Sequence, residues 1–224
     1  MKPDVLLDRT TTPDGAEIVL YERDGVYSIR VKGLELMSSR VHGSEEALAN
    51  LVLSSLDKKR RPRVLVGGLG MGFTLRAVLD SKPPASEVVV AELLPAVIRW
   101  NRNHMEHLAG APLEDPRVTL VEGDVARVIA NSLQPFDAIL LDVDNGPAAF
   151  TVERNKGLYG PSGLAAISRC LQRNGRLGVW SAGSSPEFER LLRKHGFEVE
   201  VTRVRARGIA KGPKHVIFVA RRRR

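Results

Sequence analysis

Short, almost continuous apolar runs alternate with helical patterns along the chain from residue 63 onward. The runs are RVLVGG at 63–68, EVVVAEL at 87–93, RVTLVEG at 117–123, FDAILLDVD at 136–144 and GRLGVWSAG at 175–183. Between them, residues 72–80, 95–108 and 162–173 place apolar side chains at helical spacing. Strands that alternate with helices predict a mainly parallel sheet covered on both faces, a doubly wound α/β fold.

The two ends of the chain carry patterns typical of antiparallel strands. Residues 16–23 and 26–33 flank Asp24 and Gly25, a pair that tolerates positive φ and closes a hairpin. Residues 34–40 are consistent with a third strand, so residues 1–42 are expected to form a small N-terminal β module. Near the other end, a helix over 185–196 precedes strands over 197–206 and 214–221, expected to complete the main sheet as an antiparallel hairpin.

A helix is also predicted over residues 43–56, ahead of the first strand of the main sheet. Its helically spaced apolar residues are Ala47, Leu48, Leu51, Val52 and Leu56. Ser44 is the expected N-cap, and Glu45 and Glu46 lie near the positive end of the helix dipole. We therefore expect residues 43–224 to form one Rossmann-like domain that follows the β module.

Length and composition exclude several classes of protein. A chain of 224 residues with 43% hydrophobic content can bury one main core. No run approaches the ~20 apolar residues of a membrane span, and the first residues lack a signal-peptide segment, so a cytoplasmic protein without membrane contact is expected. Cys170 is the only cysteine, which excludes an internal disulfide or a site of several thiolates, and no metal is predicted.

The formal net charge of +8 raises the question of nucleic-acid binding. Part of the excess lies in the arginines at residues 221–224. Such an end can hold phosphates by releasing counterions, or it can be a solvated, frayed terminus. No aromatic side chains alternate with these arginines as a stacking surface requires, so the sequence favours the second interpretation over nucleic acid as a partner.

Four glycines follow the first apolar run of the main domain: Gly67, Gly68, Gly70 and Gly72. In an open α/β sheet, ligands bind beyond the carboxyl ends of the strands, and the first strand-to-helix turn carries the glycines. Phe73 stands where a dinucleotide motif beginning at Gly68 needs a small residue, so a pyrophosphate cradle is not expected. The G-x-G-x-G spacing permits close approach of a nucleoside with an amino-acid-like tail, although it also occurs in plain tight turns.

Acidic residues end the next three predicted strands. Glu92 is placed to accept hydrogen bonds from a ribose diol, and Leu93 beside it is a further nucleoside-binding candidate. Asp124 is placed to accept from an adenine amine while the N–H of Val125 reaches a ring nitrogen, and Asp142 ends the fourth strand. Each acid alone is equally consistent with a helix N-cap or a solvated loop. Together, beside the glycine turn, they predict a site for an adenosyl group.

The aromatic and histidine residues have structural alternatives. Trp180, at the end of a predicted strand, is placed either to wall the substrate pocket or to pack in the core. Trp100 and Tyr159 are interpreted as structural. The histidines on predicted helices or in the terminal hairpin are interpreted as surface or capping residues, namely His104, His107, His195 and His215.

In the order of its motifs the chain resembles the spermidine synthase (polyamine aminopropyltransferase) family, within the class I S-adenosylmethionine-dependent methyltransferase fold. The motifs are LMSSRVHGSEEALANL, VGGLGMG, AELLPAVIRWNR, DPRVTLVEGDVARVI and FDAILLDVDNGP. The resemblance implies aminopropyl transfer from decarboxylated S-adenosylmethionine to a small amine acceptor without a metal, in a homodimer. It implies these roles: the nucleoside tail at Gly68 and Gly70, ribose at Glu92, adenine at Asp124 and Val125, and the amine at Asp142.

Three departures from the family pattern affect the substrate. Gly70 stands where the family carries an aspartate that meets the positive end of decarboxylated S-adenosylmethionine. Asn145 stands where the family has a second acid after Asp142, unless Asp144 takes that role, and the family's Tyr-His-Glu has only an out-of-register counterpart in VHGSEE. At an effective dielectric near 20, each lost carboxylate contact at ~4 Å forfeits about 4 kcal/mol of attraction to a cationic amine.

These departures leave three hypotheses. Aminopropyl transfer, with Asp142 as the catalytic residue and Asp144, Asn145 and Trp180 at the substrate, is the preferred one. Because Gly70 removes an acid that would repel a carboxylate, methyl transfer from S-adenosylmethionine is the alternative. The third hypothesis is a non-catalytic nucleoside- or nucleic-acid-binding protein that uses its basic C-terminus.

Overall fold

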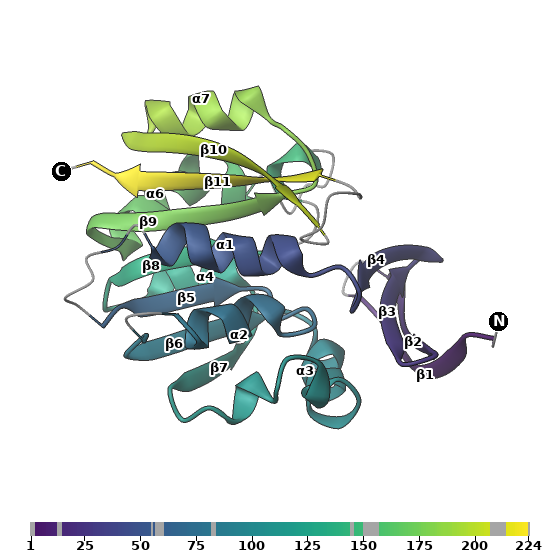
Figure 1. Cartoon of the computed structure of the whole chain (residues 1–224). Coiled ribbons are helices and arrows are strands. Elements are labelled where there is room, and N and C mark those ends of the chain that lie inside the picture. Colours follow the sequence, from purple (N-terminus) through teal and green to yellow (C-terminus); the bar gives the residue numbers. More distant parts are fainter. Residues whose placement is uncertain are drawn as a thin grey trace.

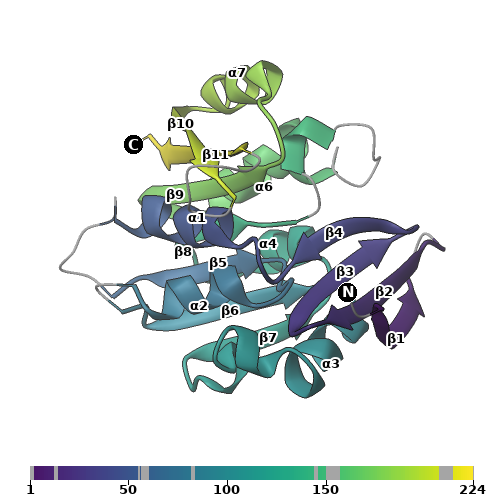
Figure 2. The ribbon, with the colours of Figure 1, turned by 45° about the vertical axis from the view of Figure 1, so that its right-hand side comes forward.

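The computed structural model of the protein describes residues 3–12, 15–54, 56, 61–81, 84–143, 146–149, 157–206 and 214–223. Within these residues the chain forms a small antiparallel sheet and a larger sheet with helices on both faces. In both views the small sheet lies beside the end of the α/β unit that carries α3 (Figures 1 and 2). The predicted doubly wound α/β fold with an N-terminal β module is confirmed.

The small sheet contains β1 (Val5–Thr11), β2 (Glu17–Arg23), β3 (Val26–Val31) and β4 (Leu34–Ser38), in that order. Asp24 and Gly25 have φ of 51° and 76°, which confirms the predicted hairpin turn. The sequence did not predict β1, because its polar second half hides the alternation of a strand. Asp8 of β1 accepts a hydrogen bond of 2.6 Å from Nε1 of the fully buried Trp100, so this strand is tied to the α/β unit.

The larger sheet has the order β10-β11-β9-β8-β5-β6-β7. Its central strands β5 (Arg63–Gly67), β6 (Glu87–Glu92), β7 (Val118–Glu122), β8 (Phe136–Leu141) and β9 (Leu171–Ser181) are parallel. The predicted antiparallel hairpin, β10 (Phe197–Arg205) and β11 (Lys214–Arg222), completes one edge. Because the chain proceeds outward from β5 on one side and from β8 on the other, the strand order reverses between these two strands. This is where a doubly wound sheet binds its ligand.

Helices cover the sheet in two groups, each with its own cluster of buried side chains. On one face lie α1 (Gly43–Leu53), α2 (Phe73–Leu79) and α3 (Pro95–Asn103), followed by the 3-10 turns η1 (Glu106–Leu108) and η2 (Pro112–Glu114). On the other lie α4 (Val125–Asn131), α6 (Pro161–Cys170) and α7 (Pro186–Lys194). A further 3-10 turn, η3 (Gly146–Ala149), follows β8.

Three details of the helices differ from the sequence prediction. The helix predicted to reach residue 173 ends at Cys170, because Leu171 already pairs with Phe136 of β8 and Asn174 has a φ of 63°. The helix predicted over 95–108 ends at Asn103 and gives way to η1. Ser44 is not the N-cap of α1: His42 occupies that position without a side-chain hydrogen bond.

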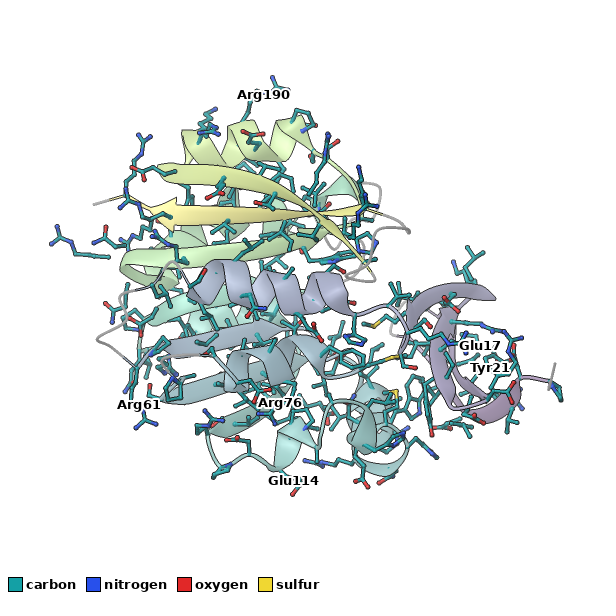
Figure 3. All side chains as sticks on the ribbon, in the orientation of Figure 1. Glu17, Tyr21, Arg61, Arg76, Glu114 and Arg190 are labelled. Atoms are coloured by element: carbon teal, nitrogen blue, oxygen red, sulfur yellow. The ribbon has the colours of Figure 1, made fainter. Side chains whose placement is uncertain are left out.

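The basic C-terminal end is ordered through Arg223, so the expected frayed terminus is wrong for this part. Arg221 and Arg222 belong to β11, where Nε of Arg221 donates to Glu198 at 2.7 Å and Arg222 donates to the carbonyl of Leu171. Elsewhere, Arg61 and Arg190 project outward from well-separated parts of the α/β unit (Figure 3). Some of the terminal charge therefore holds the edge of the sheet together.

Candidate active site

The glycine loop after β5 lies against the end of β8. Gly68 has a φ of 91°, and a Cβ there would lie 2.2 Å from the carbonyl oxygen of Asp142. The Asp142 N–H in turn donates to the carbonyl of Gly67 at 2.8 Å. Only glycine permits this approach, so the loop and Asp142 are neighbours at the point where the strand order reverses.

The N-terminal sheet reaches the same loop. Gly70 has a φ of 52°, and a Cβ there would lie 2.7 Å from the Cε of Met37 in β4. Asn101 of α3 donates to the Gly70 carbonyl at 2.8 Å, which fixes the loop from the other side. Met37 therefore fills the space that a side chain at residue 70 would need, and the small sheet forms part of the site.

Glu92, at the end of β6, holds the glycine loop in place by hydrogen bonds. Its two carboxyl oxygens accept hydrogen bonds from the backbone N–H of Leu69 at 2.9 Å and of Leu94 at 2.8 Å. The residue is only 7% exposed, and burial raises the pKa of Glu92 while the backbone donors act to lower it. The backbone N–H groups of Gly70 and Leu93 also act on this carboxyl group, so the glycine loop surrounds it. Leu93 beside it is 40% exposed.

For Asp124, the structure agrees with the alternative interpretation, that of a helix N-cap. It is the N-cap of α4, and its carboxyl oxygen accepts from the Ala126 N–H at 2.8 Å. Val125 is buried, and its Cγ2 would lie 2.8 Å from a Cβ at Gly67. The start of α4 therefore packs directly against the end of β5, which brings the third strand end to the glycine loop.

Asp142 follows β8, and its carboxyl group is oriented by α2, the helix that follows β5. Thr74, in the first turn of α2, donates its hydroxyl to Oδ2 of Asp142 at 2.6 Å. Asp142 keeps partial solvent exposure, yet desolvation by the surrounding protein raises its pKa to about 6 despite the Thr74 bond. A carboxyl group with such a pKa is a stronger base than an ordinary aspartate and is ionised at neutral pH.

A second carboxyl group, Glu45, lies in the first turn of α1; the sequence placed it near the helix N-terminus and in VHGSEE but did not predict its burial. It is 8% exposed and accepts a hydrogen bond of 2.6 Å from the Ser44 hydroxyl. Burial, and next the negative charge of Asp142, raise the pKa of Glu45 to about 7. The sequence could have indicated this burial, because Glu45 lies at helical spacing from Leu48 and Val52 and therefore on the buried side of the helix.

The pKa of Glu45 predicts a pH-dependent stability. A folded pKa of about 7 against an ordinary value of 4.5 means that the folded protein binds this proton more tightly than the unfolded chain. The free energy of unfolding should therefore fall as pH rises from 5 to 8, with a contribution from Glu45 on the order of 3 kcal/mol. Urea unfolding at both pH values measures it. Glu45→Gln should flatten the dependence, and an equally steep dependence in the variant would contradict the assignment.

Trp180 and His215 lie together on the face of the sheet that α1 covers. Their rings meet edge to face with centroids 4.6 Å apart, and burial lowers the pKa of His215. Nδ1 of His215 lies 2.9 Å from the Ser44 hydroxyl, so the interpretation of His215 as a surface or capping residue is wrong. Trp180 is partly buried against this core, and Gly146 of η3 approaches its carbonyl oxygen. It thus lies near the segment that follows Asp142.

The other candidate substrate residues, Asp144 and Asn145, lie outside the described residues. In the part of the chain that the structure describes, no group of three or more His, Cys, Asp or Glu side chains is placed to hold a metal ion. Nor is any helix among the described segments long and apolar enough to cross a bilayer.

A known protein family shares this order of motifs. The sequence profile of the spermine/spermidine synthase domain matches residues 41–189, which include α1, the glycine loop, Glu92 and Asp142. The chain belongs to the spermine/spermidine synthase family. The family resemblance expected from the motifs is thereby confirmed.

Curated relatives of the family match parts of the chain. The polyamine aminopropyltransferase of Korarchaeum cryptofilum is 36% identical over 98 residues, which are 44% of this chain and 29% of that protein. The polyamine aminopropyltransferase of Saccharolobus solfataricus is 31% identical over 147 residues, or 66% of this chain and 46% of that protein. The matched region thus spans less than half the length of either relative.

Solved structures share the fold along nearly the whole chain. Spermidine synthase from Thermotoga maritima superposes with a TM-score of 0.75 at 18% identity, covering 96% of this chain and 72% of that one. A spermidine synthase in complex with the transition-state analogue AdoDATO superposes with a TM-score of 0.74 at 17% identity, with the same coverage. This family fold therefore includes the small N-terminal sheet as well as the α/β unit.

Proposed function

We propose that the protein transfers an aminopropyl group from decarboxylated S-adenosylmethionine to a small amine. The observation that carries the proposal is the placement of Asp142: it is oriented by Thr74, has a pKa raised to about 6, and adjoins the glycine loop at the reversal of strand order. Membership of the spermine/spermidine synthase family and the named polyamine aminopropyltransferase relatives support it.

In this proposal the donor nucleoside lies across the three strand ends. Gly67, Gly68, Gly70 and Gly72 provide bare backbone beside its tail, Glu92 binds the ribose, and Leu93 offers an exposed apolar surface to the adenine. The adenine amine meets the carboxyl oxygen of Asp124 that the helix cap leaves unused, and the Val125 N–H meets a ring nitrogen. Trp180, Asp144 and Asn145 are assigned to the acceptor side.

The proposed reaction is a nucleophilic substitution that needs a general base and no oxidant or reductant. The lone pair of the acceptor amine attacks the methylene group beside the sulfonium, a C–N bond forms, and the C–S bond breaks. Methylthioadenosine leaves as a neutral molecule, and the proton lost by the nitrogen goes to Asp142. Positioning of the amine in line with the C–S bond adds to the help from this base.

One observation favours methyl transfer from S-adenosylmethionine as a second candidate. Gly70 presents no acid to the donor tail, and Met37 occupies the adjacent space. A donor that carries a carboxylate would therefore meet no negative side chain at residue 70. Met37 also narrows that space, which favours the shorter, decarboxylated tail.

Calorimetric titration separates these candidates. We expect methylthioadenosine and decarboxylated S-adenosylmethionine to bind, the latter at least about tenfold more tightly than S-adenosylmethionine, which corresponds to about 1.4 kcal/mol. The opposite preference would support methyl transfer. If none of the three ligands binds, both enzymatic proposals fail.

A further inference from the structure

A buried acid whose immediate neighbour is exposed distinguishes the start of α1. Glu45 is turned inward, while the adjacent Glu46 turns outward and pairs with His42 at 2.8 Å. The inward carboxyl group is held by Ser44, and Ser44 contacts His215 of β11, 171 residues further along the chain. Buried carboxyl groups are rare without such partners, so this position is specified by the fold.

The packing of α1 brings Glu45 to Asp142. Gly178 of β9 has no side chain, and a Cβ there would lie 2.4 Å from Val52 and 2.9 Å from Leu48, so α1 lies flat on the sheet. At the start of the helix, the His42 ring stacks on Phe73 with centroids 4.2 Å apart. Phe73 precedes Thr74, the partner of Asp142. The first turns of α1 and α2 therefore lie side by side, each with a carboxyl group fixed at its start.

The site also lacks a charge that its chemistry needs. A cationic amine is held most strongly by more than one carboxylate, and Asn145 stands in the sequence where the family carries a second acid after Asp142. We propose that Glu45 and Asp142 form a carboxyl pair that binds the acceptor amine, with Glu45 supplying a second negative charge beside Asp142. This inference rests on the proposed function and assigns its acceptor-specificity residue.

The two carboxyl groups then have different tasks. Asp142, oriented by the Thr74 hydroxyl, takes the proton of the attacking nitrogen, and Glu45, fixed through Ser44 and His215, holds the positive charge. The charged and titratable groups facing Glu45 are Asp142, Glu46 and, through Ser44, His215. Both acids must be ionised for this arrangement, so binding of a cationic acceptor weakens as pH falls below 7.

Glu45→Gln tests the pair, with Glu46→Gln as a matched control on the same helical turn. With 1,4-diaminobutane as acceptor, we expect Glu45→Gln to raise KM by about 30-fold and to change kcat much less, because the loss is of charge that binds the acceptor. Affinity for methylthioadenosine should stay within about twofold in both variants. The acid limb of log kcat/KM against pH should become one unit shallower in Glu45→Gln only, since one required ionisation is gone.

The outcomes distinguish the inference from the proposed function. If the wild-type protein transfers aminopropyl groups and Glu45→Gln matches Glu46→Gln in KM and in the slope of the acid limb, the carboxyl pair is overturned while the function stands. If the wild-type protein transfers none, calorimetry with 1,4-diaminobutane in the presence of methylthioadenosine still decides. Diamine binding lost only in Glu45→Gln supports the acidic site without the reaction, and binding equal in both variants overturns it.

Discussion

Replacement of Asp142 by Asn is expected to lower kcat for aminopropyl transfer by about 10³-fold, in the range of a lost general base. Asparagine keeps the shape of the side chain and can still accept the Thr74 hydroxyl bond, but it cannot take a proton from the amine. Because Asp142 lies on the acceptor side of the proposed donor site, affinity for methylthioadenosine should change by less than about threefold. Single-turnover kinetics and calorimetry measure the two quantities.

Thr74→Val is the matched control for this variant. It removes the hydroxyl that orients Asp142 but leaves the carboxyl group in place, so it should lower kcat by a smaller factor, about tenfold. It should also raise the pKa of Asp142 further, since the Thr74 bond acts to lower it. Turnover by Asp142→Asn equal to that of the wild-type protein would remove Asp142 from its role.

The second large effect is expected for Glu92→Gln in nucleoside binding. Glu92 accepts from two backbone N–H groups of the glycine loop region, and an amide offers one oxygen and one NH₂ in their place. At least one buried N–H then loses its partner, at a cost of about 1–3 kcal/mol. We expect the affinity for methylthioadenosine to fall at least about tenfold, together with a lower Tm. Calorimetry and thermal unfolding measure both.

Asp124→Asn provides the comparison. Asp124 is exposed and its observed bond is a helix cap, which asparagine also forms, so its effect on stability should be within about 0.5 kcal/mol. Its effect on methylthioadenosine affinity should be a few-fold at most. An equal or larger loss of affinity in Asp124→Asn than in Glu92→Gln would mean that bracing of the loop is not what the nucleoside site requires.

The arrangement of strands was predictable because buried parallel strands leave continuous apolar runs, and each one predicted from residue 63 onward is present. The errors lie where pairing with a distant part of the chain decides the secondary structure. Leu171 continues an apolar helical pattern, but pairing with Phe136 places it in β9. Likewise β1 is a strand because β2 pairs with it and Asp8 bonds Trp100, and neither contact is visible in the local sequence.

The site was predictable from its strand ends and less so from its helix. Glycines and acids at strand ends share one edge of the sheet by topology, so Glu92 and Asp142 could be assigned to the glycine loop in advance. Glu45 reads as an ordinary acid near a helix N-terminus, and its burial depends on how closely α1 lies on Gly178. The contact between Ser44 and His215 joins segments that no short motif spans.

The contact between Met37 and Gly70 has a consequence for any attempt to place an acid in the glycine loop. An aspartate introduced at residue 70 would push aside the flexible end of Met37, which belongs to the other sheet, and would have to adopt a φ of 52°. Redesign of this loop therefore has to include a residue more than thirty positions earlier in the sequence.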